Sequence, residues 1–171
     1  MNTALILHIF IAALLGGIIG LEREYRAKEA GFRTHFLVAL GSALFMVVSQ
    51  YGFAEILRYP GVSLDPSRIA AQVVSGIGFI GAGTIIFQKH VVRGLTTAAG
   101  LWVTSAIGLA CGAGMYIISI TATILVLLCL ETIYFILNRF GSRNIAITFT
   151  SPDRESIRQI IKSLRKEGSD I

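Results

Sequence analysis

The chain has 171 residues, the length of one ordinary domain, but 54% of them are hydrophobic and only 15% are charged. Soluble proteins carry roughly 25% charged residues, so this composition argues against a soluble globule. The high apolar content excludes a disordered chain, and two cysteines, Cys111 and Cys129, exclude a disulfide-rich fold. The composition therefore indicates a membrane protein.

Long stretches without charged residues predict the spans. Five are long enough to cross a bilayer as helices, and only the last contains a charged residue, Glu131. The fourth and fifth run together, with residues 112–114 (Gly-Ala-Gly) as their only plausible turn. We therefore predict an all-α transmembrane domain over residues 1–140. Its expected spans are residues 3–21, 36–54, 69–87, 95–111 and 115–137.

The positions of the basic residues predict the orientation. All but two of the 15 lysines and arginines follow the first, third or fifth span, and the exceptions are Arg58 and Arg68. Because basic residues favour the cytoplasmic side, we expect the N-terminus outside and the C-terminus in the cytoplasm. The basic cluster follows the first apolar run, which favours a retained anchor over a cleaved signal peptide. The basic charge thus indicates topology, and we expect no nucleic-acid partner.

Residues 141–171 differ in pattern from the spans. Ile145, Ile147 and Phe149 alternate with smaller or polar residues, which is typical of a strand. A helix-start signal at residues 151–153 and helical apolar spacing over residues 157–164 then predict a helix. One strand and one helix cannot bury a core, so we interpret this tail as the opening βα unit of a cytoplasmic domain.

Small residues recur at helical spacing in three of the expected spans. Such faces let helices approach closely in lipid. We predict that the third and fourth spans form the tightest pair, and that the protein forms a homodimer to which the first span contributes. The three stripes are Gly16 and Gly20; Ala71, Ser75, Gly78 and Ala82; and Thr96, Gly100, Thr104, Gly108 and Gly112.

The sequence contains no convincing motif for catalysis or for cofactor binding. Residues 76–81 match the spacing of a dinucleotide-binding loop, but they lie inside an uncharged span, so we interpret their glycines as helix packing. His8, His35 and His90 lack the spacing of metal ligands, and we expect neutral or interfacial histidines. We therefore predict neither an enzyme nor a bound cofactor.

Acidic residues suggest where function lies. Glu131 lies inside the last expected span, where a carboxylate needs either to reach the interface or to find a polar partner. Asp65 is predicted to cap the third span ahead of Pro66, and Arg68 and Gln72 share its helical face as a potential ion pair and polar neighbour. Our hypothesis is that Asp65 responds to outer-side cations or protons and biases the packing of the third and fourth spans. The alternative is a capped helix entrance with a snorkelling arginine.

Four segments carry a distinctive pattern: residues 20–24 (GLERE), 31–35 (GFRTH), 65–83 and 94–99 (GLTTAA). Over residues 4–140 the chain closely resembles the MgtC/SapB family of bacterial inner-membrane proteins. The resemblance implies about five spans with an outer N-terminus and, in longer members, a cytoplasmic ACT-like domain. The motif positions in this chain are Glu22, Arg23, Glu24, Arg33, Thr34, Asp65, Arg68, Gln72, Thr96 and Thr97.

The resemblance also implies a function. It predicts a multi-pass inner-membrane regulator of magnesium-limited growth and intracellular survival, or virulence. Such a regulator acts by helix contacts with other membrane machinery, notably the proton-translocating ATP synthase. The alternative is a divalent-cation transporter or channel in which Asp65, Glu22, Glu24 and Glu131 supply oxygen ligands. Mg²⁺ is then the expected ion, sensed in the first case and transported in the second.

Overall fold

In a computed structural model of the chain, residues 2–88 and 91–140 are described. Residues 1–135 form one compact unit, and a second unit begins at Ile136. The predicted βα tail and His90 lie outside the described residues. The helices are α1 (Asn2–Tyr25), α2 (Phe32–Tyr51), α3 (Ser67–Gly83), α4 (Leu95–Gly112) and α5 (Tyr116–Phe140), with a 3-10 turn at Ile56–Arg58 and a hairpin of β1 (Ile86–Gln88) and β2 (Val91–Arg93).

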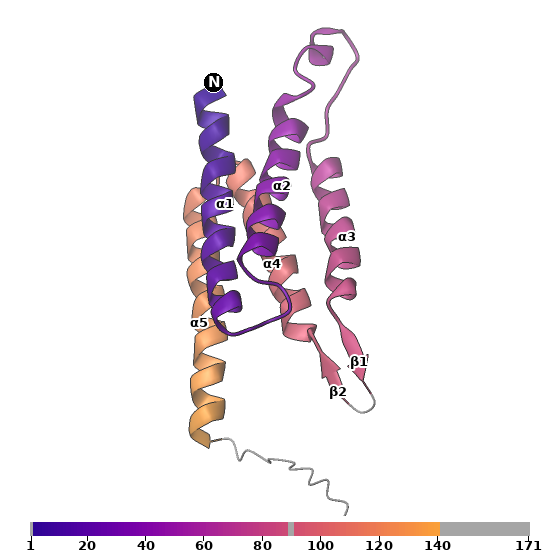
Figure 1. Ribbon diagram of the computed structural model, residues 1–171. Coiled ribbons are helices and arrows are strands. Elements are labelled where there is room, and N and C mark those ends of the chain that lie inside the picture. The colour runs from indigo at the N-terminus through magenta and orange to yellow at the C-terminus, as the bar shows by residue number, and fades with distance from the viewer. Residues whose placement is uncertain (1, 89–90, 141–171) are drawn as a thin grey trace, which may run out of the picture. The chain divides into compact units, whose positions relative to one another are not determined.

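Consecutive helices run in opposite directions (Figure 1). The loop at residues 26–31, the hairpin and the start of α4 therefore lie at one end of the bundle. The loop at residues 52–66 and the α4–α5 turn lie at the other. The turn falls at Gly114, as predicted, and Gly114 adopts a left-handed φ of 79°.

Three segments are long and apolar enough to cross a membrane: Asn2–Tyr25, Phe32–Arg58 and Leu95–Gly112. Helix α3 has 17 residues, and the apolar segment Tyr116–Thr132 of α5 is likewise shorter than these three. These apolar helices support a membrane protein. Crossing by α3 and α5, and the orientation of the chain, stay predictions.

The predicted third span is wrong at its end. Residues 69–87 were expected to form one helix, but α3 ends at Gly83, and residues 86–88 pair with residues 91–93 as antiparallel strands. Isoleucine, phenylalanine and valine favour strands, and no charged residue marks the change, so hydropathy alone does not separate the two elements. The small hairpin is thus an addition to the all-α prediction.

Helix α2 packs more extensively against α1 and against α4 than α3 packs against α4, so the predicted tightest pair of α3 and α4 is wrong. A Cβ atom built at Gly16 would lie 2.5 Å from the Ala39 Cβ, and one at Gly112 would lie 2.6 Å from the Ala43 oxygen. The small-residue faces of α1 and α4 therefore let both helices contact α2. Gly16 and Gly20 are used inside the bundle rather than on a free dimer surface.

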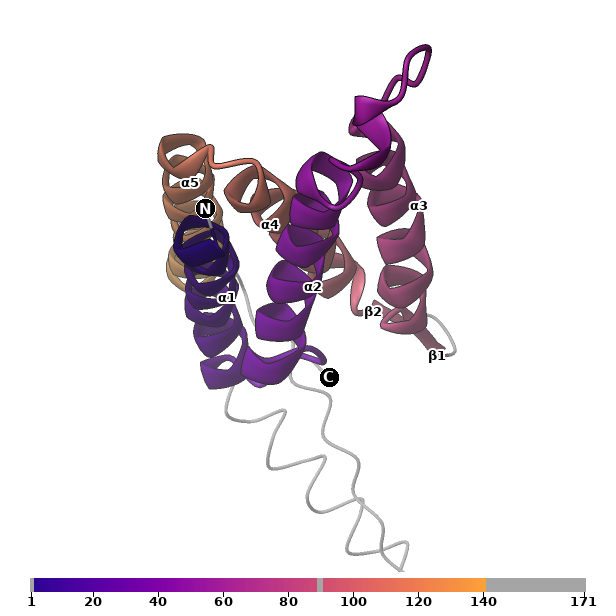
Figure 2. The same cartoon turned by 90° about the horizontal axis from the view of Figure 1, so that it is seen from above.

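Helix α3 lies to one side of the other helices (Figure 2). It contacts the rest of the bundle through Ile77 and Gly81, where an added Cβ would be 3.5 Å from the Ala98 Cβ of α4. Close packing of the glycines in residues 76–81 is confirmed only at Gly81, since a Cβ at Gly76 or Gly78 would meet nothing within 4 Å. The predicted stripe on this helix is exposed: Ala71, Ser75, Gly78 and Ala82.

Candidate functional site

Charged side chains from the last turn of α1, from Arg26 just after it and from α5 meet at the end of the bundle where α1 ends. The Arg23 guanidinium binds the Glu22 carboxylate twice, with Nε–Oε2 at 2.6 Å and Nη2–Oε1 at 2.9 Å. Arg26 reaches both Glu22, at 3.5 Å, and Glu131 of α5, at 2.5 Å. Arg23 is only 4% exposed, so its bidentate partner compensates a charge that water cannot reach. We call these four residues the arginine network.

The arginine network shows which of the two predicted environments Glu131 has. Its carboxylate has a polar partner, Arg26, which lies 105 positions earlier in the chain. Because Glu131 is 61% exposed, the pair is worth at most about 1 kcal/mol. The contact therefore guides the position of α5 against α1 more than it stabilises the fold.

Glu24 caps a different helix from its own. Its Oε2 atom accepts a hydrogen bond of 2.8 Å from the backbone N–H of Phe32, at the start of α2. The first N–H groups of a helix lack partners within it, and a carboxylate there also opposes the positive end of the helix dipole. A Cβ at Gly31 would lie 2.9 Å from the same oxygen, so the glycine makes room for the carboxylate.

A second pair joins the α1–α2 loop to α4. The Thr97 hydroxyl donates a hydrogen bond of 2.7 Å to Glu29 Oε2. This bond, the residue's own backbone N–H and the positive charges of Lys28 and Arg93 together hold the pKa of Glu29 below its usual value. The pair borders a polar pocket of about 350 Å³. Sequence analysis singled out Thr97 but missed Glu29, because no local pattern relates a loop carboxylate to a hydroxyl 68 positions away.

His35 lies in the core rather than at an interface. Its side chain is fully buried, and Nδ1 donates to the Gly31 carbonyl oxygen at 3.0 Å. The side chain lies between Gly20 of α1 and Gly100 of α4. A Cβ atom added at either glycine would contact the His35 side chain. No local pattern predicts that this histidine is buried, because glycines on two other helices create the space for it.

At the opposite end of the bundle, Asp65 accepts hydrogen bonds from the start of α3, but the helix begins at Ser67 and its N-cap is Pro66 rather than the predicted Asp65. The Asp65 Oδ1 accepts from the backbone N–H of Ser67 at 2.9 Å and from the Ser67 hydroxyl at 2.6 Å. These two bonds hold the pKa of Asp65 below its usual value, with a smaller contribution from Arg68. Among the described residues no ion pair joins Asp65 to Arg68, so the predicted local pair does not form.

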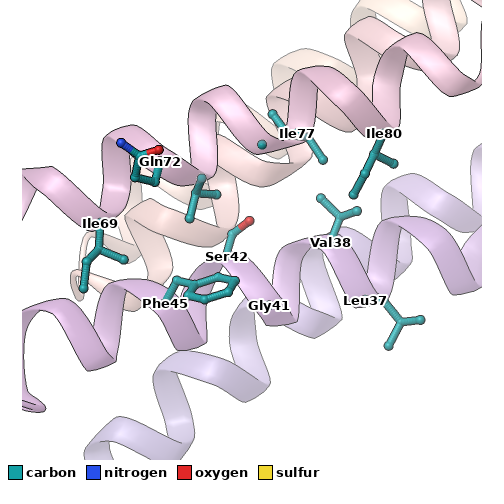
Figure 3. Close-up of a pocket in the computed structure, with 11 residues that line it drawn as sticks. Leu37, Val38, Gly41, Ser42, Phe45, Ile69, Gln72, Ile77 and Ile80 are labelled. Atoms are coloured by element: carbon teal, nitrogen blue, oxygen red, sulfur yellow. The ribbon is translucent and has the colours of Figure 1, made fainter.

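Gln72 lies in a groove between α2 and α3 (Figure 3). The groove has a volume of about 500 Å³, and apolar side chains such as Phe45 and Ile80 supply most of its lining. Arg33 and Thr96 are exposed at the other end of the bundle, and Thr34 is half-buried. The motif residues therefore form two groups at opposite ends and do not converge on one site. Within the part of the chain that the structure describes, no three metal-ligating side chains come together.

Several apolar helices in one bundle, with charged side chains gathered beyond their apolar parts, define a helical membrane protein. The pattern of the MgtC family matches residues 9–139. The chain therefore belongs to the MgtC family, as the resemblance predicted.

Named relatives support this assignment. The chain is 49% identical over 150 residues to the "Putative magnesium transporter YhiD" of Escherichia coli K12, covering 88% of this chain and 70% of the relative. It is 33% identical over 168 residues to "Protein SapB" of Bacillus subtilis, covering 95% and 72%. It is 37% identical over 174 residues to "Protein MgtC" of Salmonella typhimurium, covering 96% and 71%. No solved structure matches the chain.

Proposed function

We propose that this protein is a non-enzymatic, multi-pass inner-membrane regulator linked to magnesium-limited growth and intracellular survival. It acts by helix contacts with other membrane machinery, with the ATP synthase as the candidate partner. One observation carries the proposal: the acidic side chains that could bind Mg²⁺ already accept bonds from protein donors. These bonds connect helices or stabilise helix starts, so the carboxylates have a structural role.

The four carboxylates support this argument in the same way. Glu22 binds Arg23, Glu131 binds Arg26, and Glu24 and Asp65 accept backbone N–H groups at helix starts. A carrier or channel for Mg²⁺ needs oxygen atoms that can replace water around the ion. Both oxygens of Glu22 accept protein donors, and at Glu24, Asp65 and Glu131 one oxygen does, so protein contacts already take part of each carboxylate.

Transport of a divalent cation is the second candidate function. The printed name of the Escherichia coli relative favours it, since that protein is called a putative magnesium transporter. In this case the exposed carboxylate of Glu131 is the best ligand, because it would be released once its ion pair with Arg26 is broken.

Flux measurements separate the two functions. We expect proteoliposomes that contain the purified protein and a trapped Mg²⁺ indicator to take up no more Mg²⁺ than protein-free vesicles. The same protein should support growth of a deletion strain in low magnesium. Saturable uptake that Glu131→Gln abolishes, but the loop variant Glu55→Gln retains, would establish transport instead.

The exposed face of α3 is the surface that we propose for partner contact. Its small residues are uncovered in the described unit, and Phe79 beside them is 87% exposed. A photocrosslinker at Phe79 should capture an ATP synthase subunit or, in a homodimer, a second copy of this chain. The matched control is a crosslinker at Tyr59, which is 70% exposed and lies in the loop at residues 52–66, outside α3. Equal capture from both positions would remove α3 as the contact face.

The sensing hypothesis for Asp65 has its own test. Asp65→Asn keeps an oxygen that can accept from Ser67 and removes the charge, so the helix start should form normally. If Asp65 responds to cations or protons, the variant should reach normal membrane levels but fail to support growth in low magnesium. Full growth of the Asp65→Asn variant would show that Asp65 has only a structural role at the start of α3.

A further inference from the structure

The imidazole of His35 is completely enclosed where α1, α2 and α4 meet. Its Nδ1 atom lies 3.0 Å from the Gly31 carbonyl oxygen, which can only accept, so the ring proton is on Nδ1. Nε2 of the neutral ring is then a hydrogen-bond acceptor that points toward α4. The tertiary contacts thus fix both the tautomer and the direction of the free lone pair.

Two buried polar atoms in this region lack a hydrogen-bond partner among the described residues: His35 Nε2 and Thr104 Oγ1. Both side chains are fully buried. Buried polar atoms in folded proteins nearly always have a partner, either in the protein or in an ordered water molecule. An enclosed imidazole and an enclosed hydroxyl without partners therefore indicate a site for a small polar ligand.

The space beside Gly100 has the size for such a ligand. A Cβ atom built at Gly100 would meet a single atom within 4 Å, His35 Nε2 at 3.5 Å. At Gly112, three turns further along the same face, a Cβ would lie only 2.6 Å from a backbone oxygen of α2. Gly100 thus borders room for about one methyl-sized group, next to a free acceptor, whereas Gly112 borders none.

Thr104 lies one turn beyond Gly100 on the same face of α4, a rise of about 6 Å. A water molecule that makes two hydrogen bonds joins polar atoms at most about 5.6 Å apart. Because helical side chains tilt toward the N-terminus of their helix, a water beside Gly100 is within reach of a hydroxyl one turn later. We propose that this space is a binding site for one water molecule, which donates to His35 Nε2 and bonds to the Thr104 hydroxyl. The water joins α2 to α4 by a polar bridge, and two polar partners are sufficient to hold it.

Water-edited solid-state NMR on the full chain in lipid bilayers tests the site, with ¹⁵N-labelled histidine. We expect magnetisation from water to reach His35 Nε2 in the unmodified protein. Gly100→Ala should abolish this transfer, because its methyl group takes the space of the water. Gly41→Ala is the control, since a Cβ there meets nothing within 4 Å, and it should leave the transfer unchanged. Absence of transfer in the unmodified protein, or its persistence in Gly100→Ala, would overturn the proposal.

Thr104→Val tests the second partner and does not depend on whether Gly100→Ala folds. Valine keeps the shape of threonine and lacks the hydroxyl, so the water loses one of its two partners. We expect the transfer to His35 Nε2 to fall several-fold, with the Nδ1–H signal of the Gly31 bond unchanged. Full transfer in Thr104→Val would contradict the bridge to Thr104.

Discussion

Helices α3 and α4 carry similar small-residue patterns but use them differently. On α4, Gly108 and Gly112 contact the backbone of α2, and their side-chain positions are filled by the neighbouring helix. On α3, Gly76 and Gly78 face open space, and a groove of about 500 Å³ separates part of this helix from α2. Glycine at helical spacing thus permits close contact, but only a complementary neighbour produces it.

The physical reason lies in the driving force for helix association. In lipid, helices gain little from apolar burial, and contact surfaces must instead fit each other closely. The residues Ala39, Ser42 and Ala43 of α2 are small and buried, so they provide that fit for α1 and α4. Opposite α3, the groove is lined by larger side chains such as Leu37 and Phe45, which hold the backbones apart.

The largest effect is expected from Gly108→Leu. A side chain there must collide with the Ala39 and Ser42 positions of α2, so α4 has to move away from α2. We expect destabilisation of about 3 kcal/mol or more, measured by thermal or denaturant unfolding in detergent. The matched variant Gly78→Leu on the exposed face of α3 should change stability by less than about 0.5 kcal/mol. Equal losses would refute the contrast between the two helices.

Glu24→Ala tests the capping bond between α1 and α2. The variant leaves the Phe32 N–H without its carboxylate, and loss of a helix cap costs about 1 kcal/mol. The same unfolding assay measures the change. Glu55→Ala, an exposed carboxylate that makes no side-chain cap bond, is the control and should behave like the unmodified protein.

A smaller effect is expected at Glu131. Because the Glu131 side chain is 61% exposed, Glu131→Gln should cost at most about 1 kcal/mol. A double-mutant cycle with Arg26→Met isolates the coupling, which high salt should reduce. Coupling well above this value would show that the arginine network stabilises the unit more than surface pairs do.

The smallest expected effect is a shift in titration at Glu29. Thr97→Val removes the hydroxyl that contributes most to the lowered pKa of Glu29, so this pKa should rise toward the usual carboxyl value. Because the pKa of Glu29 is lower in the folded protein than in the unfolded chain, its ionised form stabilises the fold at pH values above the unfolded-state pKa. This contribution is lost as the pH falls through the folded-state pKa. The variant should therefore lose less stability on acidification. A titration of the Glu29 carboxyl ¹³C signal by NMR measures the shift, and unchanged midpoints would exclude the Thr97 bond as its cause.

The local features of the chain could be predicted because they depend on neighbours in sequence. The turn at Gly114 and the hydrogen bond that Asp65 accepts from Ser67 follow from residue types within a few positions. The Glu29–Thr97 pair could not be predicted, since its partners are far apart in the chain. The hairpin after α3 was missed because apolar residues serve helices and strands alike when both are short.

That this is a helical membrane protein of the MgtC family follows from the amino-acid sequence, because apolar length and the motif pattern are properties of the chain. The packing of the helices was needed to show which glycines contact a neighbour, which arginine pairs with Glu131, and that His35 is enclosed between three helices. Helical spacing places a residue on a face of its own helix. Which helix then lies against that face depends on the complementarity of surfaces that are distant in the sequence.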